Sequence, residues 1–247
     1  MLLKNWEELP GNMKNDKVKK YFDILYKKRC ALILKRIFDI GVAAFMLVIL
    51  LPVLVLISVA IKIDSKGPVF FIQTRITQYG KQFRIVKFRT MVNNAEKKGT
   101  QVTTWGDNRI TRIGRVLRKT RLDELPQLLN IISGDMSFVG TRPEVIKYYT
   151  NYTDEMMATL LLPAGVTSEA SIEFKDEEIL LVNTDNTDEV YINKVLPEKM
   201  RYNLRSIENF SLCREFKTMV RTVVAVFRKN RRQKSHIEPV VADKNKT

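Results

Sequence analysis

The feature that most constrains this chain is the uncharged apolar run from Ile40 to Ile61 (IGVAAFMLVILLPVLVLISVAI). A helix of this length can reach across the hydrocarbon core of a bilayer, which is about 30 Å thick. The run begins too far from the N-terminus for a secretory signal peptide, and no small-residue cleavage site follows it. A helix of this length in a soluble core would carry a polar face, which the run lacks. We therefore predict one membrane helix, within residues 35–62.

The flanks of the run favour a helix that enters and leaves the membrane on the same side. Both flanks are basic, so the positive-inside rule places both ends in the cytoplasm. Pro52, near the middle, removes a backbone hydrogen bond and can bend the helix, and Asp39 would prefer the membrane interface to the apolar core. A bent, re-entrant helix satisfies these conditions, and a straight spanning helix with a basic outer tail is the alternative. The flanking cations are Lys35, Arg36, Lys62 and Lys66.

The composition narrows the range of partners and sites. The chain has 247 residues and a formal net charge of +15, which predicts an anionic partner such as nucleic acid, a phospholipid surface or a phosphorylated substrate. The two cysteines, Cys30 and Cys213, lie far apart and are expected to be reduced. The single histidine, His236, lies in a polar tail, which excludes a zinc site and a histidine-based catalytic triad.

Secondary structure outside the apolar run is expected to be mixed, with more helix than strand. Residues 69–75 and 83–91 are typical of a β-hairpin, and residues 109–117 have the spacing of a helix with one cationic side. Residues 166–174 are expected to contain a short strand. A helix over 211–228 carries an apolar stripe, which either packs on the core or lies on the bilayer. The predicted fold class is α+β: a mostly helical cytoplasmic domain with a small β-hairpin and amphipathic interfacial helices.

An acidic pair, Asp123-Glu124, stands alone among cations. Opposite charges lower the pKa of a carboxylate, so we expect both groups to be ionised and available as nucleophile, base or metal ligand. A salt-bridged helix start, with Asp123 near the N-cap, is the alternative. The surrounding cations are Arg109, Arg112, Arg115, Arg118, Lys119, Arg121 and Arg142.

A series of motifs in fixed order supports a catalytic interpretation of the pair. They are Lys35-Arg36-Ile37-Phe38-Asp39, the apolar run with Pro52, Lys87-Phe88-Arg89-Thr90-Met91, Asp107 to Gly114, Leu122 to Leu128, and Gly134 to Pro143. Over about residues 33–143 this order resembles the bacterial sugar transferases, the monotopic phosphoglycosyl transferases that start glycans on polyprenyl phosphate. Weaker similarity in helix pattern continues to about residue 228.

The resemblance implies a re-entrant membrane helix, a cytoplasmic active site and an Asp-Glu dyad that depends on Mg²⁺, for which Mn²⁺ substitutes. The implied reaction transfers a sugar 1-phosphate from a UDP-sugar to undecaprenyl phosphate and releases UMP through a covalent aspartyl-phosphosugar intermediate. Carried over by residue, Asp123 is the nucleophile and metal ligand, and Glu124 is its partner. The residues expected to bind phosphate or substrate are Arg118, Arg142, Lys87, Arg89 and Asp107. For Lys87 and Arg89 a solvated strand face is an equal alternative, and for Asp107 the alternative is a turn.

The same resemblance implies the setting of the reaction. It would be the first membrane step of exopolysaccharide, capsule, O-antigen or glycoprotein glycan assembly, at the cytoplasmic face of the bacterial inner membrane. The expected partners are the UDP-sugar, undecaprenyl phosphate, membrane lipid, a second copy of the chain and downstream glycosyltransferases, with no nucleic acid. The chain then divides into a basic amphipathic segment (1–34), the membrane helix (35–62), the catalytic domain (63–228) and a charged disordered tail (229–247).

Departures from the family pattern limit what can be predicted. Thr141 replaces a usual proline, Leu51 precedes Pro52 where serine is frequent, and residues 166–174 differ from the segment that many members carry. The identity of the sugar therefore stays open.

Two other functions are considered. The first is a membrane-tethered nucleic-acid binder, against which the lack of aromatic residues among the cations of this chain argues. The second is a non-catalytic membrane scaffold, against which the intact acidic pair argues.

Overall fold

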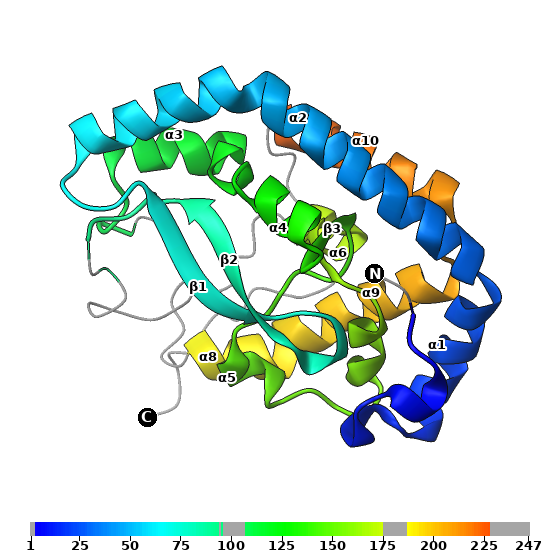
Figure 1. Ribbon diagram of the computed structural model, residues 1–247. Helices are drawn as coiled ribbons and strands as arrows, with labels where there is room; N and C mark the ends of the chain where they lie inside the picture. The colour runs from blue at the N-terminus through cyan, green and yellow to red at the C-terminus, as the bar shows by residue number, and fades with distance from the viewer. Residues whose placement is uncertain (1–2, 94, 96–106, 175–186, 228–247) are drawn as a thin grey trace, which may run out of the picture.

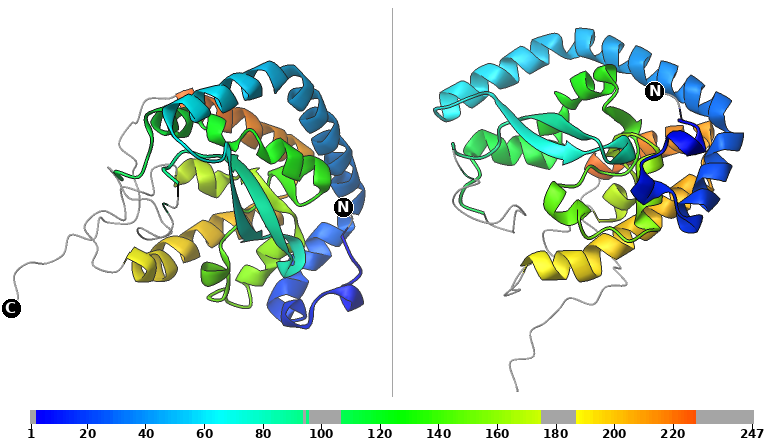
Figure 2. Two further views of the ribbon diagram at one scale, coloured as in Figure 1. Left: turned by 60° about the vertical axis from the view of Figure 1, so that its left-hand side comes forward. Right: turned by 60° about the horizontal axis from the view of Figure 1, so that its bottom comes forward.

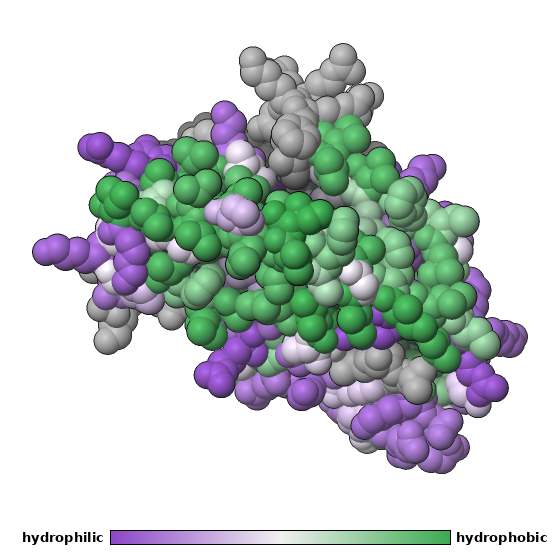
Figure 3. Space-filling view, turned by 45° about the horizontal axis from the view of Figure 1, so that its top comes forward, coloured by the Kyte–Doolittle hydropathy of each residue, from purple (hydrophilic) through white to green (hydrophobic). Residues whose placement is uncertain are grey.

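The computed structural model describes residues 3–93, 95, 107–174 and 187–227. Its longest element is helix α2, Arg29–Asp64, which arches over one side of the molecule (Figure 1). Among the described residues, α2 is the one helix that is long and apolar enough to cross a membrane. Its side chains are exposed along much of its length, for example Val48 at 74%, Leu56 at 69% and Ile63 at 82%. Figure 3 shows the apolar surface that results. The predicted apolar helix is therefore present, with one side packed on the protein and the other exposed.

Helix α2 is bent part-way along its length, so that both of its ends turn toward the rest of the molecule (Figures 1 and 2). Pro52 lies inside the helix and cannot donate a hydrogen bond to the carbonyl four residues earlier. A proline is one of the few established causes of such a bend. The bend agrees with the predicted shape, whereas the side of the membrane on which each end lies stays a prediction.

The N-terminal segment forms helix α1, Asp16–Lys27, which Asn15 caps by accepting a hydrogen bond from the Val18 N–H at 2.9 Å. The buried residues of α1 are Val18, Tyr21, Phe22 and Leu25. They pack in one cluster with residues such as Ile76 and Leu161. The predicted amphipathic helix is therefore present, but its apolar face packs on protein and is not available to a bilayer.

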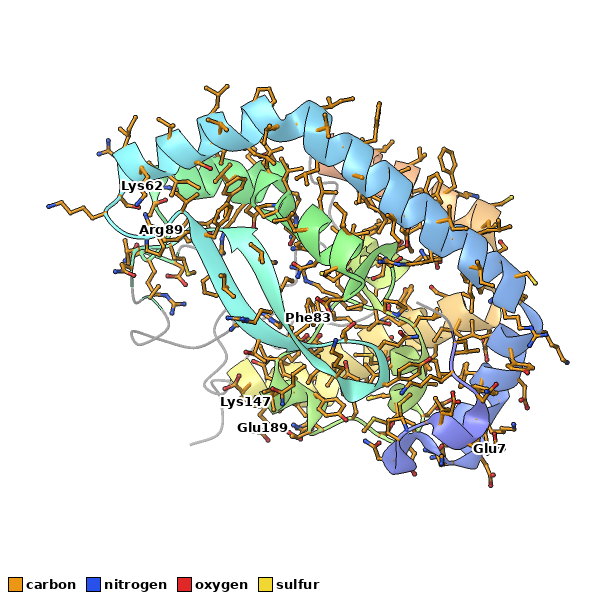
Figure 4. The ribbon with its side chains drawn as sticks, viewed as in Figure 1. Glu7, Lys62, Phe83, Arg89, Lys147 and Glu189 are labelled. Atoms are coloured by element: carbon orange, nitrogen blue, oxygen red, sulfur yellow. The ribbon has the colours of Figure 1, made fainter. Side chains whose placement is uncertain are left out.

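The predicted hairpin is confirmed. Strand β1, Phe70–Ile76, pairs antiparallel with β2, Gln82–Phe88. Phe83 and Ile85 of β2 are buried in a cluster with residues of α4, Gln127–Ser133. The hairpin therefore lies against the helix that follows the acidic pair, and Figure 4 shows Phe83 on this side of the sheet.

A second, two-stranded parallel sheet joins β3, Met136–Val139, to β4, Ala164–Thr167. Gly140, just after β3, lies close to Gly165 of β4, where a Cβ on Gly165 would lie 2.2 Å from the Gly140 nitrogen. The prediction of a strand over 166–174 is wrong beyond β4. Ser168 accepts a hydrogen bond from the Ser171 N–H at 3.0 Å and so caps helix α6, Glu169–Glu173.

Helices form most of the remaining described structure. They are α3 (Arg112–Thr120), α5 (Ile146–Tyr149), α8 (Thr187–Val190), a π-helical turn (Tyr191–Val195), α9 (Leu196–Glu208) and α10 (Leu212–Phe227). The apolar stripe of α10 is exposed, with Phe216 at 60% and Val223 at 59%. Core packing therefore does not explain that stripe.

Polar contacts fix both ends of α2 to the domain. At the first end, buried Lys35 forms ion pairs with Glu215 of α10 and, at 3.6 Å, with Asp39. Asp39 also accepts a hydrogen bond from Ser137 of β3 at 2.6 Å. At the other end, Arg89 donates to the carbonyl and hydroxyl oxygens of Ser65, each at 2.7 Å. These contacts place the membrane helix in a defined position relative to β3 and the hairpin.

Candidate active site

The acidic pair lies in a single 3-10 turn, Leu122–Glu124, between α3 and α4. Arg121 ends α3 in the left-handed region, at φ 59°, and turns the chain into this segment. A non-glycine residue in this region costs about 1–2 kcal/mol, and such strain often marks functional sites. Asp123 and Glu124 are only 9% and 8% exposed. The pair is therefore buried in the 3-10 turn, and Pro126 rather than Asp123 is the N-cap of α4.

Cations from three segments surround Glu124. Its Oε1 accepts hydrogen bonds from Lys87 Nζ at 3.0 Å and Arg142 Nη2 at 2.9 Å, and Arg121 Nη1 lies 3.9 Å away. Burial would raise the pKa of Glu124, but the charges of Arg142, Lys87 and Arg121 outweigh it and hold the pKa well below its usual range. Glu124 is therefore ionised, as predicted.

Asp123 has a different environment. Its Oδ1 is buried and has no hydrogen-bond partner in the described structure. Burial, followed by the charge of Glu124, raises the pKa of Asp123, and the nearby cations Lys87, Arg121 and Arg118 oppose this shift without reversing it. The prediction that the cations lower both pKa values is wrong for Asp123, because the sequence does not reveal how deeply the carboxylate is buried.

Asn130 of α4 brings Lys87 to the acidic pair. Its Nδ2 donates to the Arg84 carbonyl at 2.8 Å, and its Oδ1 accepts from the Val86 N–H at 3.0 Å. These two bonds attach α4 to the outer edge of β2, so that Lys87 reaches Glu124. Burial is the main reason that the pKa of Lys87 falls to about 8. Asn130 has no predicted role, since its function depends on a strand more than 40 residues earlier.

The segment that carries Arg142 is held from several sides. The close approach of Gly140 and Gly165 is accompanied by a hydrogen bond from the Gly165 N–H to the Thr141 carbonyl at 2.8 Å. Arg75 of β1 donates to the Pro143 carbonyl at 3.2 Å. These contacts direct the Arg142 side chain toward Glu124.

A buried network continues from this segment into the C-terminal half of the chain. Glu144 Oε1 accepts a hydrogen bond from the Tyr191 hydroxyl at 2.7 Å, and Lys199 Nζ donates to the same hydroxyl at 2.9 Å. All three side chains are buried. The sequence gives no signal for Tyr191 or Lys199, because neither lies in a motif of the acidic site.

Of the other residues that were predicted to bind phosphate or substrate, only some lie near the acidic pair. Arg118 donates from Nε to Thr90 Oγ1 at 3.0 Å, and its charge acts on Asp123. Arg89 instead lies at the end of α2 near Lys62, where it anchors the chain (Figure 4). Asp107 pairs with Arg109 at 2.6 Å, which agrees with the turn alternative. No contact of Arg89 or Asp107 with the acidic pair is found in the described structure, and a phosphate-binding role for them stays a prediction.

Comparison with known proteins accounts for this combination of an apolar helix and a buried acidic pair. The sequence profile described as bacterial sugar transferase matches residues 30–229, which is most of the chain. The chain belongs to the bacterial sugar transferase family.

Family members with curated names share substantial identity with this chain. A UDP-glucose:undecaprenyl-phosphate glucose-1-phosphate transferase of Caulobacter vibrioides is 35% identical over 192 residues, covering 76% of this chain and 68% of the relative. A UDP-N-acetylgalactosamine-undecaprenyl-phosphate N-acetylgalactosaminephosphotransferase of Aeromonas hydrophila is 42% identical over 123 residues, covering 50% of this chain. An Escherichia coli relative with the same name as the Caulobacter protein is 39% identical over 143 residues, covering 57% of this chain. The matches span 29% of the Aeromonas protein and 31% of the Escherichia coli protein.

The carboxylates at the acidic pair fit a metal ion that is bound jointly by protein and substrate. Groups of three or more His, Cys, Asp or Glu that could hold an ion are absent from the described part of the chain. Glu124 is engaged by cations, whereas Asp123 retains an unpartnered oxygen. Mg²⁺ commonly binds through one or two carboxylates, waters and substrate phosphates, so Asp123 together with a diphosphate fits this ion.

Proposed function

We propose that this protein is a phosphoglycosyl transferase that moves a sugar 1-phosphate from a UDP-sugar to undecaprenyl phosphate and releases UMP. The observation that carries the proposal is a buried, incompletely partnered Asp123 beside a Glu124 that holds Lys87 and Arg142. The names of the Caulobacter, Aeromonas and Escherichia relatives support the class of donor and acceptor. We place the reaction at the cytoplasmic face of the bacterial inner membrane, as the first membrane step of glycan assembly.

In the first step, an oxygen of Asp123 attacks the phosphorus bonded to the sugar, and the bond to the bridging oxygen of UMP breaks. UMP leaves, and the sugar phosphate remains bonded to Asp123 as an acyl phosphate. In the second step, a phosphate oxygen of undecaprenyl phosphate attacks the same phosphorus, and the aspartyl oxygen leaves as a restored carboxylate. Covalent catalysis of this kind lets one pocket serve a soluble donor and then a lipid acceptor.

The cations around the acidic pair reduce the main barrier to the first step. Two like charges about 4 Å apart repel by about 4 kcal/mol at an effective dielectric of about 20, so a carboxylate approaches a diphosphate only with help. Glu124 holds Lys87 and Arg142 in position, and both side chains can share their N–H groups with phosphate oxygens. Glu124 thus acts as a positioning residue, because its low pKa makes it a poor base.

We further propose that Asp123 and the donor diphosphate hold a Mg²⁺ ion, which Mn²⁺ can replace. The chemistry that such an ion supplies is neutralisation of diphosphate charge. Lys87, Arg142 and Arg118 neutralise the remainder, and each comes from a different element of the fold.

The membrane arrangement of the proposal is a re-entrant α2 with both ends in the cytoplasm. The bend near Pro52 and the basic flanks support it. The exposed apolar stripe of α10 supports a second contact with the bilayer surface. Together these contacts would hold the acidic pair near the depth of the lipid phosphate.

The test is UMP release by the purified protein in nanodiscs, with undecaprenyl phosphate and a panel that includes UDP-glucose and UDP-N-acetylgalactosamine. UMP should appear in the presence of at least one UDP-sugar, and the product should be an undecaprenyl diphosphate sugar. Asp123→Asn serves as the matched control for contaminating activity. Equal UMP release by this variant, or a product that lacks the sugar, would contradict the proposal.

A further inference from the structure

Two of the buried polar atoms without a hydrogen-bond partner lie in the same short segment. Among the described side chains, such atoms are Gln78 Oε1, Arg89 Nε, Asp123 Oδ1 and Gln127 Nε2. Gln127 is only 1% exposed, and its amide nitrogen carries two N–H groups that water does not reach. Buried polar groups are almost always hydrogen-bonded, so an unpartnered donor in a native core requires an explanation.

The backbone brings the unpartnered donor and the unpartnered acceptor within reach of one another. Asp123 lies in the 3-10 turn, and Leu125 (φ −53°, ψ −38°) and Pro126 (φ −62°, ψ −15°) continue the helical conformation into α4. Asp123 and Gln127 are therefore four residues apart on a helical path. Side chains at this spacing are neighbours, with Cβ atoms about 5–6 Å apart.

The second buried glutamine, Gln78, differs from Gln127 in having a partner for its amide donor. Its Nε2 donates to the Leu161 carbonyl at 2.8 Å, so its unpartnered atom is the oxygen. At Gln127 the unpartnered atom is the donor, and it is the group that complements the unpartnered Oδ1 of Asp123.

We propose that Gln127 is a further catalytic residue, which donates a hydrogen bond from Nε2 to Oδ1 of Asp123 during the reaction. This inference rests on the proposed function, since it assigns Asp123 as the nucleophile. In the structure the two atoms are not hydrogen-bonded, so the bond requires the Gln127 side chain to rotate toward Asp123. With Oδ1 held in this way, Oδ2 is the oxygen directed at the phosphorus.

The bond would act in both steps. When Oδ2 attacks phosphorus and UMP departs, Oδ1 becomes the carbonyl oxygen of the aspartyl acyl phosphate and keeps its hydrogen bond. When the acceptor phosphate attacks and the Oδ2–phosphorus bond breaks, negative charge returns to the carboxylate. A donor already directed at Oδ1 stabilises that charge without further reorganisation. No proton is transferred in either step.

Kinetics of Gln127→Met test the assignment, because methionine has a similar size and no donor. A hydrogen bond to a charged group predicts a fall in kcat of about 10- to 100-fold, with KM for the UDP-sugar changed less than about threefold. Gln127→Glu should lose at least as much, since its carboxylate repels Asp123. The matched control is Gln78→Met, which removes a buried glutamine elsewhere and should keep its kcat. Wild-type kcat in Gln127→Met would overturn the assignment, as would a rise in KM alone, which would indicate a contact with the bound substrate instead.

A thermal double-mutant cycle separates this inference from the proposed function. Midpoints of unfolding are measured for the wild type, Asp123→Ala, which removes the acceptor, Gln127→Met and the double variant. Residues that share a hydrogen bond give non-additive effects, and we expect a departure of about 2 °C or more from the sum of the single changes. Additive changes would exclude the bond. Absence of UMP release by the wild type would instead contradict the proposed function, and the cycle would still decide whether the two side chains interact.

Discussion

Arg142 donates a hydrogen bond from Nη2 to Glu124 Oε1 at 2.9 Å and so joins two motifs that lie 18 residues apart in the chain. The same carboxylate oxygen accepts a hydrogen bond from Lys87 of the hairpin at 3.0 Å. Glu124 is thus the point at which β2, the turn after α3 and the segment after β3 meet. Asp123, the preceding residue, keeps a buried Oδ1 without a hydrogen-bond partner.

Replacement of Asp123 by asparagine should abolish formation of the covalent sugar-phosphate adduct. The amide is a much weaker nucleophile than the carboxylate, and we expect the rate to fall by at least about 1,000-fold. Intact-protein mass spectrometry after incubation with UDP-sugar alone measures the adduct. Circular dichroism shows whether the variant is folded, and an adduct of wild-type abundance on folded Asp123→Asn would exclude this residue as the nucleophile.

UMP release should decline as the pH rises through about 8. Burial lowers the pKa of Lys87 to about 8, so the side chain is protonated below this pH and loses its charge above it. Glu124, Arg142 and Asp123 are the charged groups that act on it. Neutral Lys87 no longer attracts phosphate or Glu124. Lys87→Arg keeps its charge at all these pH values, so its pH–rate profile should extend to higher pH. Identical profiles would show that another group controls this limb.

Tyr191→Phe should weaken both the fold and the placement of Arg142. The change removes the hydroxyl that donates to Glu144 and accepts from Lys199. Hydrogen bonds to charged groups contribute about 1.5–3 kcal/mol, which corresponds to a fall in Tm of roughly 3–12 °C in a protein of this size. We expect kcat/KM for UMP release to fall about tenfold. Tyr26→Phe, at an exposed tyrosine of α1, is the control and should change neither quantity.

Removal of divalent cations should stop UMP release, because Asp123 must approach a diphosphate whose charge the arginines and Lys87 neutralise only in part. Activity is measured after dialysis against chelator and again after addition of Mg²⁺ or Mn²⁺, each of which should restore it. Full activity in the chelated protein would mean that the cationic side chains are sufficient by themselves.

Residues on both sides of α2 should face the cytoplasm. Lys17→Cys on α1 and Lys119→Cys on α3 place exposed thiols before and after the membrane helix. Both are made in a background in which serine replaces the exposed Cys30 and Cys213. An impermeant thiol reagent should label neither cysteine in intact cells and both after permeabilisation. Labelling of Lys17→Cys alone in intact cells would establish a spanning helix.

Pro52→Ala, which restores a backbone donor, should shift some molecules toward the spanning state.

Several features of the molecule could be predicted from local sequence. The apolar run predicts a membrane helix because its length and lack of charge suit a bilayer, and α2 contains the whole of it. Alternating residues around a short turn predict the hairpin, because strand pairing across a turn is a local event. The Asp123-Glu124 pair is recognisable because two carboxylates stand among many cations.

Other features depend on contacts between distant segments. The sequence favoured equal roles for Lys87 and Arg89, whereas the structure places Lys87 on Glu124 and Arg89 on Ser65. Although Lys87 and Arg89 are only two residues apart, they contact different elements. The reason is that β2 is attached to α4 at Asn130 and ends beside α2.

The sequence by itself determined that a basic chain with one membrane helix carries an acidic pair, because charge, length and hydropathy are properties of consecutive residues. Tertiary structure decided which cations meet that pair and in which direction the pKa of each carboxylate shifts. It also decided that the apolar face of α1 packs on protein while that of α10 is exposed. The physical reason is that burial and electrostatic coupling depend on distances between segments far apart in the chain, which local patterns do not specify.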